Sequence, residues 1–277
     1  MACEKCGLTL FISSVLDFMC YLLQDIFLGS NWLLRVLRSL TVPFLIFVLL
    51  PGCSDHIFDN PLDPDNVGKL DEFMLMFQSP AEDPGDLAWD GIFLWNCDTV
   101  NAEILQLYPY DGSLSAVLKA PTAHPEGLTY RKDNLWVSDA YSRRIIEVDS
   151  LTGREIFHFS APGTNPKGLA YDAAEDVLYN IDANTLNIYK IDPDNGKILA
   201  AIASPSNSPL GLTYVNKHLY VASFSENIIY VIDSETGTKL DQFEGPKHAP
   251  IGLTWDDDNL WTVDWDTMIY RLTPSSP

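Results

Sequence analysis

The sequence predicts an all-β fold: a five-bladed β-propeller built from four-stranded blades. Three observations lead to it, namely a motif that recurs at spacings of 41, 41, 43 and 41 residues, short β-rich runs between turn residues in each copy, and a strand-like run ahead of the first copy. A repeat of about 40 residues that holds four strands is typical of a propeller blade. The chain has 277 residues, 47% of them hydrophobic, which excludes an intrinsically disordered chain.

The repeated motif reads Pro-x-[Gly/Asp]-Leu-[Ala/Thr]-[Tyr/Trp], and a Leu-[Trp/Tyr] pair follows each copy. In the second copy the predicted strands cover residues 128–130, 135–138, 145–148 and 155–159. Large Leu and Tyr/Trp alternate with small Ala or Thr along the first strand, so we expect large side chains to pack on small ones between neighbouring blades. The five copies begin at Pro84, Pro125, Pro166, Pro209 and Pro250.

An Asp-x-x-x-Gly turn separates the predicted third and fourth strands in three copies, at 149–153, 192–196 and 233–237. It places glycine where the turn needs a positive φ. The last copy ends after its third strand, 268–272, while residues 73–77 match the fourth-strand run of the second copy. We therefore expect the N-terminal strand to complete the last blade of a propeller over residues 70–277, which removes the free edges of an open array.

The region before the propeller has the parts of an export signal. Arg35 and Arg38 precede an apolar run over residues 40–50. The next residues, Leu50-Pro51-Gly52-Cys53, resemble the bacterial lipobox, in which the cysteine is lipidated. We expect residues 1–52 to be a signal segment with an over-extended start and residues 53–69 to be a tether lipidated at Cys53. A plain signal or anchor, and a membrane helix over residues 7–29, stay open as alternatives.

The net charge bears on the binding partners of the protein, and the cysteine content bears on its disulfides. The chain carries 17 Lys and Arg against 38 Asp and Glu, a formal net charge of -21. Phosphates would be repelled, so no nucleic-acid partner is expected. Cleavage before Cys53 would leave only that cysteine and Cys97, which excludes an internal disulfide beside a lipidated Cys53 and predicts that Cys97 is a small buried side chain. We expect a monomer.

Strand directions predict which residues share one end of the propeller. First strands begin, and second strands end, at the same end, here called face X; the opposite end is face Y. The residues after each motif proline should surround the channel on face X, and loop residues should join them. The predicted ligand-binding residues of face X are Glu126, Lys167, Tyr141, Arg143, Phe224 and Trp265.

An acidic residue ends the second strand in four copies: Asp98, Asp139, Asp182 and Asp264. A residue that recurs in this way is best interpreted as a turn residue that accepts backbone N–H groups. A Ca²⁺ ion held by these carboxylates is the alternative, since calcium prefers oxygen ligands; no other cofactor is expected. Glu126 breaks the repeat and is flanked by His124, so it is either a general acid/base or a solvated rim charge.

The two motifs resemble the YVTN/NHL-like exported propellers over residues 70–277, a resemblance that implies fold more than activity. The run Pro125-Glu126-Gly127-Leu128-Thr129 also resembles the five-bladed glutaminyl-peptide cyclotransferases. That resemblance implies an acyltransferase in which Glu126 acts as acid/base while an N-terminal glutamine closes to pyroglutamate. The chain departs from that family at Gly85-Asp86-Leu87 and at Lys167-Gly168-Leu169-Ala170, where the family has Gln-Gly-Leu and Trp-Gly-Leu-Thr.

A weaker similarity to gluconolactonase-type propellers implies a Ca²⁺-dependent, lactonase-like hydrolase, although their Asn-Gly-Leu motif is missing. The leading hypothesis is a non-catalytic binding module. It would be a lipoprotein of the bacterial cell envelope, at the outer membrane or its periplasmic face, that binds a peptide, glycan or protein through face X.

Overall fold

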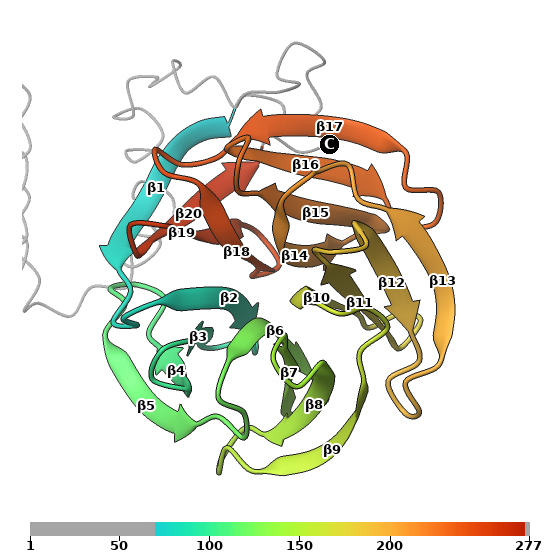
Figure 1. Ribbon diagram of the computed structural model, residues 1–277. Helices are drawn as coiled ribbons and strands as arrows, with labels where there is room; N and C mark the ends of the chain where they lie inside the picture. The colour runs from blue at the N-terminus through green and yellow to red at the C-terminus, as the bar shows by residue number, and fades with distance from the viewer. Residues whose placement is uncertain (1–69, 275–277) are drawn as a thin grey trace, which may run out of the picture. The chain divides into compact units, whose positions relative to one another are not determined.

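The structure is a computed structural model that describes residues 70–274, and these form five antiparallel sheets of four strands around a central axis (Figure 1). In four sheets the first strand lies innermost and the fourth outermost, which confirms the predicted propeller. The strands of blade 1 are β2 Pro84–Trp89, β3 Leu94–Asp98, β4 Glu103–Leu107 and β5 Leu114–Lys119; of blade 2, β6 Pro125–Arg131, β7 Asn134–Asp139, β8 Arg144–Asp149 and β9 Glu155–Ser160; of blade 3, β10 Pro166–Asp172, β11 Val177–Asp182, β12 Asn187–Ile191 and β13 Ile198–Ala203; of blade 4, β14 Pro209–Val215, β15 His218–Ser223, β16 Ile228–Asp233 and β17 Lys239–Glu244; and of blade 5, β18 Pro250–Trp255, β19 Leu260–Asp264, β20 Met268–Pro274 and β1 Leu70–Gln78.

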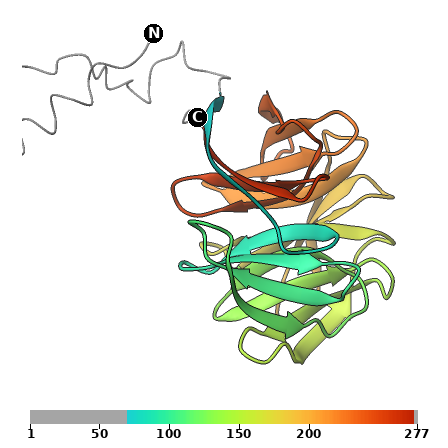
Figure 2. The same cartoon turned by 90° about the vertical axis from the view of Figure 1, so that its left-hand side faces the viewer.

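The ring closes as the sequence predicts. The N-terminal strand β1 lies along β20, the last strand of the chain, and becomes the outermost strand of blade 5 (Figure 2). The two strands are antiparallel, with Met76 opposite Tyr270 and Gln78 opposite Met268. This pairing joins both ends of the propeller within one sheet, so unfolding of the last blade would have to release the first strand as well.

The core lies between the blades. Leu128 of blade 2 packs in one cluster with Ala88 of blade 1, which confirms the expected packing of large on small side chains. The motif aromatics also stack on aromatic rings of the neighbouring blade, whereas the sequence predicts that they pack on small side chains. Tyr214 stacks on Tyr179 of the preceding blade, with ring centroids 5.7 Å apart and an interplanar angle of 10°. Such ring pairs stabilise the blade interface beyond the area that they bury.

The predicted Asp-x-x-x-Gly turns are present on face Y. Gly153, Gly196 and Gly237 have φ values of 71°, 72° and 70°, in the left-handed region that favours glycine. A fourth such turn, in blade 1, ends at Gly112 with φ 71° but begins with Tyr108, so the sequence pattern did not include it. The glycine, and not the aspartate, is therefore what all four turns share.

Several predictions fall outside the described residues. These are the signal segment 1–52, the alternative membrane helix 7–29, and the tether 53–69 with its lipidated Cys53. Within residues 70–274 there is no helix of the length and hydrophobicity that a membrane span requires. Cys97, the cysteine of this range, is a free thiol and fully buried, as predicted.

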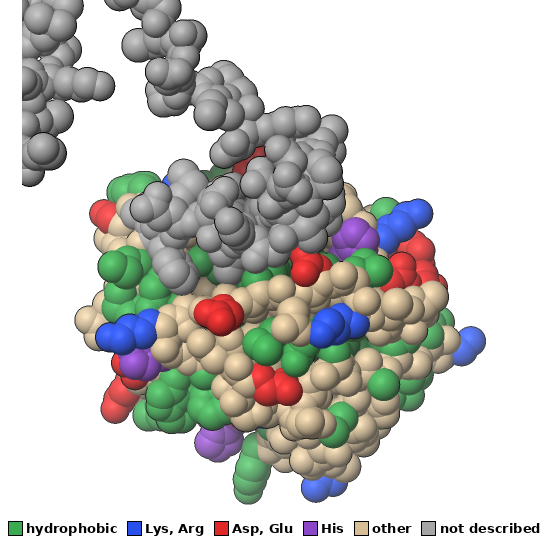
Figure 3. All heavy atoms as spheres, turned by 90° about the horizontal axis from the view of Figure 1, so that it is seen from above, with side chains coloured by type: hydrophobic (Ala, Val, Ile, Leu, Met, Phe, Trp, Pro, Cys, Tyr) green, Lys and Arg blue, Asp and Glu red, His purple; other side chains and the backbone are tan. Residues whose placement is uncertain are grey.

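The outer rim of the ring is formed by the fourth strands, whose side chains are mostly exposed. Seen from the rim, hydrophobic side chains lie in separate groups among polar and charged ones (Figure 3). Two cavities of the described part of the chain lie instead at the two mouths of the central channel, one on each face.

Candidate functional site

A cavity of about 350 Å³ opens at the channel mouth on face X and is called the X pocket here. Its wall contains the residue that follows the motif proline in all five blades, as the strand directions predict. Phe224 and Trp265, which directly follow the second strands of blades 4 and 5, complete its rim. The five residues after the prolines are Gly85, Glu126, Lys167, Leu210 and Ile251.

The polar side of the X pocket is an ion pair between neighbouring blades. Glu126 Oε1 lies 2.8 Å from Lys167 Nζ, and the two side chains are 26% and 17% exposed. Asp83 also lines the pocket, and one of its carboxylate oxygens accepts a hydrogen bond from the Thr99 hydroxyl. The pocket thus offers a ligand one ammonium donor and two carboxylate acceptors within a partly desolvated space, where charges interact more strongly than in water.

The opposite side of the X pocket is apolar. The rings of Phe224 and Trp265 meet edge to face, with centroids 5.3 Å apart and an interplanar angle of 70°. Leu210 and Ile251 continue this wall. A ligand with a polar end and an apolar side chain would match the two halves of the pocket.

Two of the predicted ligand-binding residues do not line the X pocket. Tyr141 is 81% exposed, and its ring lies 5.6 Å from that of His124. Arg143 has a positive φ of 56°, and its carbonyl accepts the backbone N–H of Ala161 in the next connection. Phe224 and Trp265 directly follow their second strands, whereas Tyr141 and Arg143 follow Asp139, the end of β7, by two and four residues. Both therefore lie nearer the third strand and further from the channel axis.

The four recurrent aspartates act in their own turns. Asp139 Oδ1 accepts the N–H groups of Tyr141 at 2.7 Å and Ser142 at 3.1 Å. Asp98 and Asp182 make the equivalent two bonds, and Asp264 accepts the N–H groups of Asp266 and Met268, which confirms the predicted turn role. The structure does not bring these four carboxylates together, and among residues 70–274 no three His, Cys, Asp or Glu side chains group as a metal site would require.

The sequence interpretation missed a buried carboxylate in the channel, Asp86. In blade 2 the channel-facing Glu126 precedes Gly127, whose Cβ would meet Ser138 Oγ at 2.7 Å and Lys167 O at 2.1 Å. In blade 1 the order is reversed: a Cβ on Gly85 would meet the equivalent atoms, Cys97 Sγ and Glu126 O. Glycine takes the crowded position in both blades, so Asp86 faces the channel one residue deeper than Glu126 does. The inverted Gly-Asp order is the sequence signal that could have revealed it.

Asp86 joins blades that lie far apart in the sequence. Oδ1 accepts the backbone N–H of Leu253 at 2.8 Å, and Oδ2 accepts those of Leu169 at 3.2 Å and Leu128 at 3.4 Å. Burial raises the pKa of Asp86 well above its usual range, and these N–H donors offset part of that effect. Burial likewise raises the pKa of the neighbouring Cys97 thiol, with Asp86 and Glu126 adding to it, so Cys97 stays a neutral hydrogen-bond donor to the Glu126 carbonyl.

No protein-family model matches the chain, and no curated protein sequence does. Among solved structures, the glutaminyl cyclase of Myxococcus xanthus is similar, with a TM-score of 0.64 and 12% identity over 73% of this chain and 94% of that one. A catalytically inactive virginiamycin B lyase of Staphylococcus aureus matches with a TM-score of 0.48 and 19% identity over 69% of this chain and 66% of that one. At these identities the likeness shows the propeller fold and leaves the activity open.

Proposed function

We propose that this protein is a non-catalytic binding module that takes the amino-terminal end of a peptide into the X pocket. The observation that supports this most directly is the Glu126–Lys167 pair, 2.8 Å apart, facing an apolar wall in one pocket. The ammonium group of a peptide would be accepted by Glu126 and Asp83, and Lys167 would donate to the first peptide carbonyl. The first side chain would lie against Phe224 and Trp265.

The charge of the chain supports a ligand with a positive end. The net charge of -21 raises the local concentration of cations near the protein. An uncharged ligand end would shield the two pocket carboxylates from water with Lys167 as the one cation among the described residues of the pocket wall, and an acidic end would add a third negative charge; both are costly.

The test is a titration of tryptophan fluorescence, since Trp265 lies in the pocket, with glutaminyl-alaninamide and its N-acetyl derivative. We expect the free amine to bind and the acetylated peptide to bind at least about tenfold more weakly, because acetylation removes the charge. Glu126→Gln should weaken binding of the free amine by a similar factor. Glu175→Gln is a matched control, since Glu175 also pairs with a lysine, Lys190, at 2.7 Å but outside the X pocket. Equal binding of both peptides would overturn the proposal.

A second candidate function is glutaminyl cyclisation. It is favoured by the position of Glu126 in the X pocket and by the fold shared with the Myxococcus xanthus enzyme. In this reaction the α-amine attacks the side-chain amide carbon, a C–N bond forms, and ammonia leaves. Glu126 would take the proton from the attacking amine and return it to the leaving nitrogen. Ammonia release from glutaminyl-alaninamide by the wild type but not by Glu126→Gln would establish catalysis. Binding of the peptide without ammonia release would instead support the non-catalytic binding module.

We further propose that the protein is held in the bacterial cell envelope by a lipid on Cys53. The support is the Arg-apolar-Cys pattern of residues 35–53. Labelling of expressing bacteria with a radioactive fatty acid should mark the wild type and not Cys53→Ala, and fractionation should place the labelled protein with the outer membrane. Label that persists in the variant would contradict the proposal.

A further inference from the structure

The mouth of the channel on face Y holds a second cavity, of about 670 Å³, called the Y cup here. Its wall includes the aromatic residue of the repeated motif from every blade, at or next to the end of each first strand. The sequence interpretation treated these rings as packing residues alone. They are Trp89, Tyr130, Tyr171, Tyr214 and Trp255.

The rings of the Y cup are held in place from outside. Trp255 stacks on Tyr220 of blade 4, at 6.4 Å and 27°, much as Tyr214 stacks on Tyr179. Each of these contacts covers one side of a ring that also lines the cavity. Because packing between the blades has already ordered these side chains, a ligand would not have to pay that conformational entropy.

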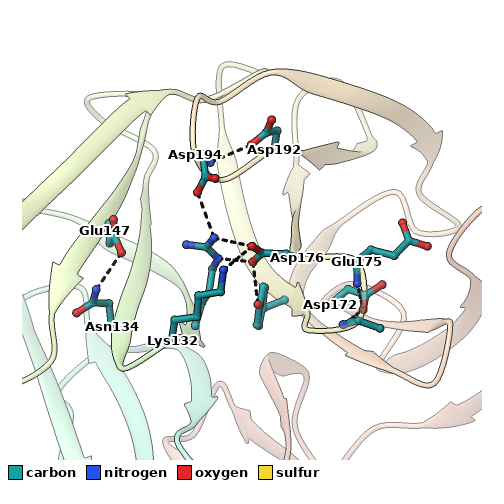
Figure 4. Close-up of polar contacts among 11 residues, drawn as sticks. Lys132, Asn134, Glu147, Asp172, Glu175, Asp176, Asp192 and Asp194 are labelled. Carbon is teal, nitrogen blue, oxygen red and sulfur yellow. Dashed lines mark hydrogen bonds and ion pairs between the residues drawn. The ribbon is translucent and has the colours of Figure 1, made fainter.

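Tyr171 is fixed by an ion cluster between blades 2 and 3. Figure 4 shows Lys132, Asp176 and Asp194 of this cluster. Its hydroxyl donates to Asp176 Oδ1 at 2.9 Å, and the Arg131 guanidinium lies 5.8 Å from its ring centroid. Arg131 Nε is 2.7 Å from Asp176, and Lys132 and Asp194 extend the cluster. The cluster neutralises most of its own charge, so the field within the Y cup depends mainly on the residues that line it.

Those lining residues carry an excess of negative charge. Three are carboxylates, Asp90, Asp172 and Asp257, and one is a cation, the exposed Lys217. Asp90 is held by the N–H of Phe93 at 2.7 Å and by Trp95 Nε1 at 2.8 Å, and Asp172 by the N–H of Ala174 at 2.8 Å. The N–H donors that position Asp90 and Asp172 are all neutral, so these hydrogen bonds leave the negative charge of both carboxylates uncompensated.

We propose that the Y cup is a second binding site, for a soluble organic ammonium cation. Aromatic rings attract cations through their quadrupoles, and the best-known use of such walls is recognition of quaternary ammonium groups. The surrounding carboxylates add Coulombic attraction for the same charge. The volume lies in the range of small-molecule pockets, so the cup has room for the apolar and hydroxyl substituents of such a cation.

The test compares choline with dimethylbutanol, its uncharged carbon isostere, in calorimetric titrations of the full-length protein. We expect choline to bind at least about tenfold more tightly than the isostere, since the two differ in charge and hardly in shape. Trp255→Leu should weaken choline binding about tenfold, and Asp257→Asn about two- to fivefold. Lys217→Gln should strengthen it, because it removes the one cation of the wall. Glu244→Gln, an exposed acid on the outer strand β17, is the matched control and should change nothing.

Three results would overturn the proposal: equal binding of choline and the isostere, no binding of either, or choline binding that Glu126→Gln abolishes and Asp257→Asn spares. The last would place the cation in the X pocket. Because Trp255 could also be needed for folding, the Asp257→Asn and Lys217→Gln variants, both at exposed turn positions, keep the test independent of stability. Failure here leaves peptide binding at face X untouched, since that is tested with different variants.

Discussion

The X pocket and the Y cup lie at opposite ends of the same five inner strands and are built in different ways. The X pocket uses the position after each motif proline, which differs in every copy and places one acid and one base side by side. The Y cup uses the last motif position, which is aromatic in every copy. A wall of unlike residues can orient an asymmetric ligand, whereas a ring of like residues offers similar contacts from all sides. The comparison shows that one repeat can supply both kinds of site.

Asp86 lies between the two cavities along the channel, and its substitution should have the largest effect. Asp86→Ala would leave the N–H groups of Leu128, Leu169 and Leu253 buried without an acceptor. At about 1 kcal/mol or more for each unpaired group, we expect a loss of about 3 kcal/mol in the free energy of unfolding. Urea unfolding followed by circular dichroism measures it. A loss below about 1 kcal/mol would mean that Asp86 does not hold the inner strands of blades 2, 3 and 5 to blade 1.

Asp86 also predicts a pH dependence with a definite sign. Its pKa is raised above the ordinary 3.8, so in the window above pH 3.8 the folded protein holds a proton that the unfolded chain has released. The contribution of Asp86 to stability is therefore largest at acid pH and falls as pH rises through that window. The stability of wild type relative to Asp86→Asn should decline accordingly, and an increase with pH would contradict the buried, raised-pKa description.

On face X, Asp139→Ala should destabilise the protein by about 2 kcal/mol, because two turn N–H groups and the hydroxyls of Thr122 and Ser142 lose their acceptor. The expected result is a lower midpoint in thermal melting, with ligand binding in the X pocket retained, since Asp139 does not line it. Unchanged stability together with lost binding would instead make the aspartate a ligand residue.

On face Y, Arg131→Met tests how far the ion cluster supports the Y cup. The Arg131 side chain is 7% exposed but its partner Asp176 is 38% exposed, so solvent screening limits the expected loss to about 1 kcal/mol at neutral pH. Arg131 and Lys132 hold the pKa of Asp176 well below its ordinary 3.8. The stabilisation is therefore complete above pH 3.8 and is lost as pH falls below it. Unfolding curves of wild type and variant should converge in acid; a constant difference would point to packing alone.

The smallest stability effect is expected at the X pocket itself. Glu126→Gln, Lys167→Met and the double variant should each change the free energy of unfolding by about 0.5 kcal/mol or less, since a partly exposed ion pair contributes little. Their effect on peptide binding should be much larger and non-additive, because the pair acts as one unit. Additive losses in binding would show that the ligand contacts the two groups independently.

Much of the fold could be predicted because the strands and turns depend on residues within a single copy of the repeat. Leu128 and Thr129 show the alternation of large and small residues along a single strand, and Gly153 shows the turn conformation that only glycine adopts easily. The closing role of β1 followed from counting strands. The candidate site was predicted in part: Glu126 and Lys167 line the X pocket, whereas the exposed Tyr141 does not. Tyr141 lies in a loop, and the path of a loop relative to the channel axis does not follow from the strand directions.

By itself, the sequence determined the number of blades, their strands and turns, and which positions surround each end of the channel, because period, β-propensity and glycine placement act within single repeats. Only the tertiary structure decided that Asp86 is buried beneath three distant N–H groups, that Glu126 pairs with Lys167, and that five motif aromatics wall one cavity. These features arise where residues from different copies meet around the axis. Distances across a closed ring depend on all five blades together, and no single repeat encodes them.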